Sequence, residues 1–154
     1  MQTTQPRQPD LVAAVIRRVF VNRTRTPQEM LDVTGRDQYS DKDVLEVMPR
    51  GQGNEVEVFF FNFGYYATNA DLEQEFDLRG FKPADPYSLI AANAADPVFA
   101  ESHPNATHWK DTEGKWCFAA CYRFRGRRVV SVHPYKETEW GEWGRNWWFA
   151  GIRK

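Results

Sequence analysis

The segment KWCFAACYRFRGRRVVSVHPY, residues 115–135, decides the fold because its side chains alternate with the period of a β-strand. In its first half, even-numbered positions are mostly bulky and aromatic, whereas odd-numbered positions are small or basic. Arg125-Gly126 separates the two alternating runs and suits a two-residue turn. The segment therefore predicts a β-hairpin with one aromatic face and one face of small side chains, Cys117, Ala119 and Cys121.

An alanine-rich helix is predicted to pack against this small face. The run PYSLIAANAA, residues 86–95, follows an Asp that can cap a helix and starts with the Pro favoured at the first helical position. On one strand, Cys117 and Cys121 would lie about 13 Å apart at ~3.3 Å per residue. That distance is too long for a disulfide, and the pair cannot chelate one metal together. We expect two small buried thiols in a reducing compartment.

Further helices are predicted from apolar spacing and capping residues. Residues 10–20 place apolar side chains at i, i+4 and i+8 after Asp10, which predicts a helix. The patterns at Thr26 and at residues 40–43 predict two short helices that begin with capping residues. Another capped helix is expected after Thr68.

The strands are predicted from period-two alternation and from continuous apolar runs. EVEVFFFNFG, residues 55–64, alternates and then becomes continuously apolar, which is typical of a central strand covered on both faces. Three more strands are expected from residue 105 to residue 135. The run NWWFAGIRK, residues 146–154, predicts the last strand.

These elements predict a single α+β domain with a largely antiparallel sheet of about five strands and helices packed mainly on one face. The domain spans residues 10–154: a helical part at 10–48, a strand-helix-helix part at 55–102 and a C-terminal β-meander at 105–154. Residues 1–9 are polar and are expected to form a disordered tail. The order of elements resembles that of nuclear transport factor 2-like cone folds, in which helices pack into a curved sheet.

Composition and charge argue against several classes of protein. The chain has 154 residues, 42% of them hydrophobic, so it is long and apolar enough to bury a core. Its 20 basic and 21 acidic residues give a formal net charge of −1, which argues against a surface devoted wholly to nucleic acid or anionic membrane. No apolar run approaches the ~20 residues of a membrane span, and the N-terminus lacks the apolar region of a signal peptide. We therefore expect a cytoplasmic protein with no membrane partner.

The common catalytic and cofactor-binding motifs are absent from the sequence, so we expect no catalytic residues, no cofactor and no metal. The histidines keep a pocket under consideration. If a three-residue loop joins the strands around residues 111–115, His108 and His133 flank Phe118 on one face. Two strand spacings separate them by about 9.6 Å, which is long for one metal ion but fits two sides of a pocket.

The tip of the predicted hairpin combines arginines with aromatic rings. Guanidinium groups beside rings suit phosphates, stacked bases or a protein hot spot. Like charges placed opposite one another destabilise a hairpin unless an anion approaches them. That anion can also be internal, from Glu137, Glu139 or the acidic segment 69–77. The candidate binding residues of the tip are Tyr122, Arg123, Phe124, Arg125, Arg127 and Arg128.

Four of the six tryptophans lie near the C-terminus. Strand alternation places Trp147 and Trp148 on opposite faces, so at least one of them belongs to the core. Trp140 and Trp143 lie in ETEWGEWG, residues 137–144, whose glycines and glutamates predict an exposed loop. These two rings either form a binding surface beside the hairpin or fold back over the aromatic sheet face.

The sequence favours a non-enzymatic interaction module that binds a macromolecule, with a protein as the leading class of partner, through the hairpin and the Trp-rich loop. One alternative is a small-ligand or carbohydrate pocket, or an enzyme, on a cone-like α+β fold with His108 and His133 at the pocket. Another is a nucleic-acid-binding protein, which the near-neutral charge ranks lower. An uncovered aromatic sheet face would also suit a homodimer.

Overall fold

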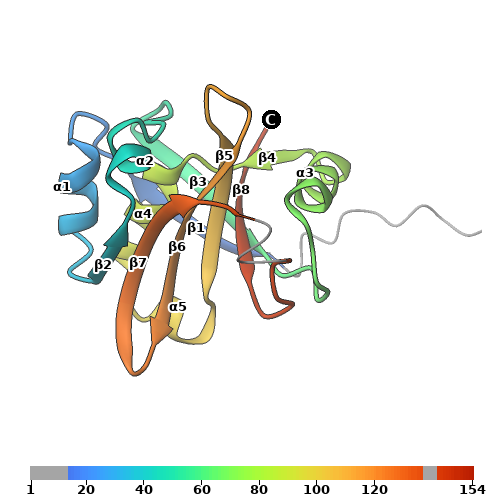
Figure 1. Ribbon diagram of the computed structural model, residues 1–154. Coiled ribbons are helices and arrows are strands. Elements are labelled where there is room, and N and C mark those ends of the chain that lie inside the picture. Colours follow the sequence, from blue (N-terminus) through green and yellow to red (C-terminus); the bar gives the residue numbers. More distant parts are fainter. Residues whose placement is uncertain (1–13, 137–141) are drawn as a thin grey trace, which may run out of the picture.

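The computed structural model describes residues 14–136 and 142–154, which are built around one curved β-sheet (Figure 1). Within these residues the sheet has eight strands: seven follow the order β1-β3-β8-β5-β6-β7-β2, and the eighth, β4, pairs with β8 beside this path. The tail expected at residues 1–9 lies outside the described residues. The strands are β1 Val15–Phe20, β2 Asp37–Ser40, β3 Glu55–Phe61, β4 Phe81–Pro83, β5 Asn105–Lys110, β6 Trp116–Phe124, β7 Arg127–Pro134 and β8 Trp148–Arg153.

The sheet is mixed, so the prediction of a largely antiparallel sheet of about five strands is wrong. β5 runs parallel to β8, and β2 runs parallel to β7. The unexpected strands β2 and β4 contain only 4 and 3 residues, which is too short to show a period of two in the sequence. The coarser description as a single α+β domain agrees with the structure.

Residues 15–20 form the strand β1 where the sequence predicted a helix. The apolar spacing of four that suggested a helix also fits a strand, because residues four apart share a face in both. Val15, Ile16 and Val19 are β-branched, which favours the strand, and β1 pairs antiparallel with β3 along its whole length. Val19 is buried while Phe20 is exposed, as strand alternation requires. Tertiary pairing therefore overrides the helical spacing.

Five short helices connect the strands within the described residues, and several begin where capping residues predicted. The capping box expected at Thr26 is present, and the helix expected after Thr68 also begins with one; in each, an acidic side chain accepts a hydrogen bond from the backbone of the cap residue. None of these helices is long and apolar enough to cross a bilayer. The helices are α1 Pro27–Asp32, α2 Lys42–Glu46, α3 Asn69–Leu78, α4 Pro86–Ala95 and α5 Phe99–Ser102.

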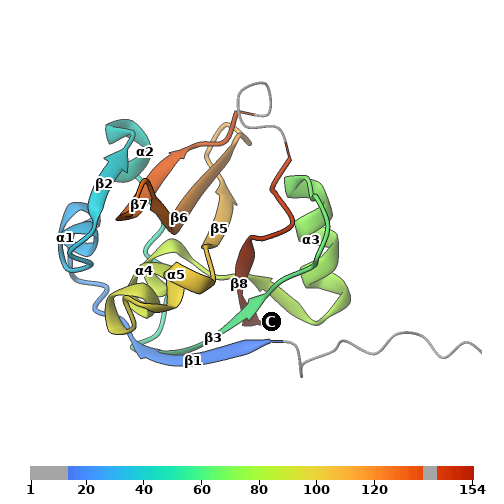
Figure 2. The ribbon, with the colours of Figure 1, turned by 90° about the horizontal axis from the view of Figure 1, so that it is seen from below.

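One face of the sheet, called the helix face, is covered by α1, α2, α4 and α5; Figure 2 shows α4 and α5 on this side. The alanine-rich α4 packs as predicted, with Leu89 fully buried in a cluster that includes Ala119 and Cys121 of β6. Both cysteines are free and buried. Asn93 of α4 and Asn105 of β5 exchange two hydrogen bonds of 2.7 and 3.0 Å. The helix face is therefore closely packed, and this buried amide pair is hydrogen-bonded.

The opposite face, called the aromatic face, has α3 as its covering helix. Phe59 and Phe61 of β3 pack against Phe81 of β4 with ring centroids 4.7 and 5.0 Å apart. Phe76 of α3 meets Phe61 edge-on, so α3 covers the part of this face built from β3, β4 and β8 (Figure 2). The part built from β6 and β7 has no described helix over it and is called the open half.

Candidate functional site

A cavity of about 590 Å³ lies on the open half of the aromatic face. Its volume falls within the range of roughly 300–1,000 Å³ that is typical of small-molecule sites. Aromatic rings dominate the lining, which comes from β2, β6, β7 and the segment that precedes β8. The lining residues are Tyr39, Phe118, Ala120, Tyr122, Phe124, Ser131, His133, Tyr135, Glu142, Trp143, Gly144 and Trp147.

Two small residues leave the space that the cavity occupies. Ala120 and Ser131 lie directly opposite each other on β6 and β7, and larger rings flank Ala120 along its strand at Phe118 and Tyr122. The Tyr122 and Ser131 hydroxyls lie 2.8 Å apart and form a hydrogen bond, which holds the Tyr122 ring at the side of the cavity. Larger side chains in place of Ala120 or Ser131 would fill this space.

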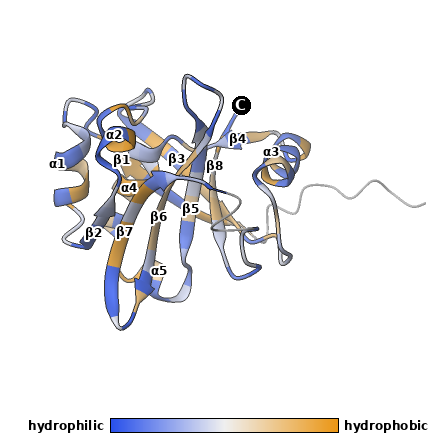
Figure 3. Ribbon diagram, in the orientation of Figure 1, coloured by the Kyte–Doolittle hydropathy of each residue, from blue (hydrophilic) through white to orange (hydrophobic). Residues whose placement is uncertain are grey.

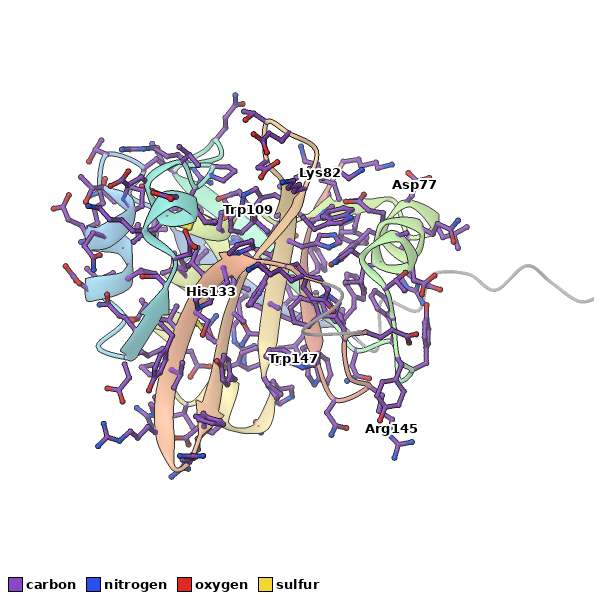
Figure 4. The ribbon with its side chains drawn as sticks, in the orientation of Figure 1. Asp77, Lys82, Trp109, His133, Arg145 and Trp147 are labelled. Carbon is purple, nitrogen blue, oxygen red and sulfur yellow. The ribbon has the colours of Figure 1, made fainter. Side chains whose placement is uncertain are left out.

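Trp143 and Trp147 form a wall of the cavity. Trp143 is buried, and its ring meets Trp147, Phe118 and Phe149 edge-on at centroid distances of 5.2, 5.5 and 5.4 Å. Trp147, labelled in Figure 4, meets Tyr122 edge-on at 5.6 Å. Edge-to-face contacts are favourable and restrict ring orientation. The wall is therefore preformed.

Of the two loop tryptophans, Trp143 folds back onto the aromatic face, while Trp140 lies outside the described residues. Trp143 and Ala67 exchange backbone hydrogen bonds of 2.8 and 3.1 Å. The Trp143 indole Nε1 donates to Asn69 Oδ1 at 2.9 Å. These bonds attach the segment before β8 to the beginning of α3, so Trp143 is a fixed part of the pocket wall and not an exposed anchor.

The two candidate pocket histidines have different surroundings. The register of β5, β6 and β7 places His108 and His133 on either side of Phe118, as predicted. His133, labelled on β7 in Figure 4, lines the cavity. His108 does not, because it is buried under Trp116, whose ring stacks on the imidazole at a centroid distance of 4.2 Å.

His108 is nevertheless connected to the pocket wall through Asn69. Asn69 Oδ1 accepts from Trp143 Nε1 and also lies 2.8 Å from His108 Nδ1. That Nδ1 must carry a hydrogen, because an amide oxygen only accepts. His108 Nε2 is buried without a hydrogen bond, 3.4 Å from Glu73 Oε1. Desolvation lowers the pKa of His108, against the opposing effect of Glu73, so the imidazole is neutral at neutral pH.

Carboxylates of the same chain neutralise part of the arginine-rich hairpin tip. Arg123 and Arg128 lie opposite each other, and both approach Glu101 Oε1, at 3.9 and 2.9 Å. Arg127 approaches Asp37 at 3.2 Å. Exposed pairs of this kind contribute only about 0–1 kcal/mol each. The tip is therefore hydrophilic (Figure 3) and held by weak, exchangeable ion pairs.

The acids at the tip are not those that the sequence suggested. The acidic segment 69–77 belongs to α3, which lies on the other side of the molecule from the hairpin tip (Figure 1). Glu137 and Glu139 lie outside the described residues. No local pattern in the sequence indicates Asp37 and Glu101, because β2 leaves no period-two signal and no pattern places α5 beside the hairpin.

Sequence reasoning identified part of the pocket. Ser131 lies on the same strand face as His133, so alternation along β7 could have added it. Tyr39 comes from β2, whose pairing with β7 left no signal in the sequence. Trp147 was placed opposite Trp148 by parity, and the structure puts them on opposite faces as predicted. Four candidates line the cavity: Tyr122, Phe124, His133 and Trp143.

The polar groups of the cavity are few: tyrosine and serine hydroxyls, the His133 imidazole and the Glu142 carboxylate. This arrangement can hold an apolar body and orient it with a small number of hydrogen bonds. Among the described residues, no group of three or more His, Cys, Asp or Glu side chains is placed to hold a metal ion. No protein-family model, curated protein or solved structure matches this chain.

Proposed function

We propose that this protein binds a small, largely apolar ligand with a planar ring system in the cavity of the open half. The observation that carries the proposal is the preformed aromatic cavity of about 590 Å³ over Ala120 and Ser131. Planar rings stack on or meet aromatic walls favourably, and the few polar groups can orient the ligand. A cavity whose walls are already fixed also binds with a smaller ordering cost.

The hypothesis of a protein partner has less support than the pocket. It depended on an exposed Trp-rich loop, whereas Trp143 is buried in the pocket wall. It also depended on free arginines, whereas three of those at the tip approach Asp37 or Glu101. Protein hot spots are built from large anchors that become buried on binding, and one of the two proposed anchor groups is already buried.

The test is a fluorescence titration with N-phenyl-1-naphthylamine, an uncharged ring compound that brightens in apolar surroundings. We expect saturable binding to the wild-type protein at one site. Ala120→Leu, which fills the cavity, is expected to weaken binding about tenfold or more. Leu78→Ala is the matched control, because Leu78 is an exposed apolar residue on α3 outside the cavity. It should leave binding unchanged.

The fold of each variant is checked by circular dichroism and thermal unfolding. If Ala120→Leu does not fold, Trp147→Ala provides a second change in the wall. Equal binding by the wild-type protein and a folded Ala120→Leu variant would place the probe elsewhere and contradict the proposal. Absence of saturable binding to the wild-type protein would contradict it as well.

A further inference from the structure

The pocket has a cationic end at the hairpin tip. Phe124 lines the cavity and lies directly opposite Arg127 in the β6–β7 ladder. Directly opposed residues share a sheet face, so Arg127 lies on the pocket side of the sheet. Asp37, its ion-pair partner, is two residues before the lining residue Tyr39 and shares that face. The side chains of this pair nevertheless line a second cavity, of about 410 Å³, together with Glu101, Arg123 and Arg128.

Arg125 is the cation that lies against a ring of the aromatic cavity. Its guanidinium lies 5.2 Å from the centroid of the Phe124 ring, so it stacks on a residue that lines the cavity. Within residues 14–136 and 142–154, no carboxylate pairs with Arg125, in contrast to the three other arginines of the tip. Arg125 is thus a cation at the rim of the cavity, without an ion-pair partner among the described residues.

The backbone at Arg125 is unusual for an arginine. Its φ of 50° makes it the one non-glycine residue with positive φ among those that the structure describes. Gly126 follows with φ of 78°, so both central residues of the turn are left-handed, the geometry that favours Asn, Asp or Gly at the first position. Asn would adopt this backbone conformation at a lower free-energy cost than Arg. Strained residues that the fold does not need are typical of functional sites.

The opposite end of the cavity has the opposite charge. Glu142 lines the cavity next to Trp143, which contacts Phe118 and Tyr135. Phe118 lies six residues before Phe124 on β6, about 20 Å away at ~3.3 Å per residue. A bound molecule with a negative group would therefore orient that group toward the hairpin and away from Glu142.

We propose that the ligand is an apolar ring system with one anionic group, a carboxylate, sulfonate or phosphate, which Arg125 binds. The proposal rests on the proposed function, because the ring system occupies the same cavity. Guanidinium groups bind such anions through charge-assisted hydrogen bonds.

Two probes with the same ring skeleton separate the anion from the rings. 8-Anilinonaphthalene-1-sulfonate carries one sulfonate, and N-phenyl-1-naphthylamine is the same molecule without it. We expect the wild-type protein to bind the sulfonate more tightly than the neutral probe at low salt, and added salt to reduce the difference. Arg125→Asn should weaken sulfonate binding about tenfold, the loss expected for one charge-assisted hydrogen bond, and leave the neutral probe unchanged.

Arg125→Asn is informative because it is expected to weaken sulfonate binding without destabilising the fold. Asn suits the left-handed turn, so this variant should unfold at the same or a higher temperature than the wild type. Arg123→Gln is the matched control, since Arg123 lies on the same hairpin but faces Glu101 on the other side of the sheet. This control should preserve the difference between the two probes.

The outcomes separate the two proposals. Equal affinity for both probes, with no effect of Arg125→Asn, would overturn the anionic ligand while the pocket stands. An equal loss of sulfonate binding in Arg123→Gln would also overturn it, because the loss would then reflect the total charge of the hairpin. Failure of both probes to bind would overturn the pocket itself, and the anionic ligand with it.

Discussion

The two faces of the sheet are built from the same strands, but one is sealed by helices and the other contains a cavity. On the helix face, small side chains such as Ala119 and Cys121 allow α4 to pack directly on the sheet. On the aromatic face, α3 covers only the part over β3, β4 and β8, and bulky rings surround Ala120 and Ser131 on the rest. Small residues under a helix produce a sealed core, whereas small residues among rings produce a cavity.

Because of this difference, neighbouring residues of one strand contribute either to the stability of the fold or to the pocket. In β6, Ala119 and Cys121 pack in the same core cluster as α4, while Phe118, Ala120, Tyr122 and Phe124 line the pocket. Substitutions one position apart are therefore expected to affect different properties.

The largest effect is expected on the helix face. Leu89 of α4 is fully buried, so Leu89→Ala removes buried methyl groups and leaves a cavity under the helix. We expect a loss of about 2–5 kcal/mol in the free energy of unfolding, measured by urea denaturation. A loss below about 1 kcal/mol would show that α4 is not tightly packed, and would break the distinction between the two faces.

A smaller effect is expected where α3 covers the aromatic face. A Cβ at Gly151 of β8 would lie 2.7 Å from Cε1 of the buried Phe76 ring. Gly151→Ala therefore forces the ring or the helix to shift, at a cost of about 1–3 kcal/mol by the same measurement. Gly144→Ala is the control, because its nearest neighbour would be 3.7 Å away. Equal costs would indicate that α3 is loosely held.

The sequence predicted on which face of a strand each side chain lies better than it predicted which strands pair with each other. Alternation assigned the faces of β6 and β8 correctly, because a period of two is a local property. The same local reasoning predicted a helix for residues 15–20, which instead form a strand because they pair with β3. It also missed Tyr39, since β2 reaches the pocket only by pairing with β7 across a long stretch of chain. Local patterns carry no information about such pairings.

The covered part of the aromatic face should also lose stability in acid. In the unfolded chain a histidine has a pKa of about 6.5, whereas burial lowers the pKa of His108 in the fold. Below pH 6.5 the unfolded state therefore binds a proton that the native state does not. We expect the free energy of unfolding to fall by at most about 1.4 kcal/mol per pH unit between pH 6.5 and the lowered native pKa.

Urea denaturation at pH 7.5 and pH 5.5 measures this slope. His108→Gln should flatten it, although the variant is also expected to be less stable at both pH values. An unchanged slope in His108→Gln would place the acid sensitivity elsewhere and remove His108 from this account.

The smallest effect is expected at the rim of the open half. Phe124 is about half exposed, and its ring contacts Arg125 at the hairpin tip. Phe124→Ala removes a large ring, as Leu89→Ala removes a large side chain, but it opens no sealed core. We expect the free energy of unfolding to change by no more than about 0.5 kcal/mol, while binding of the naphthylamine probe weakens. A cost of 2 kcal/mol or more would mean that this rim is part of the core. The open half would then be packed as tightly as the helix face, and the contrast between the two faces would not hold.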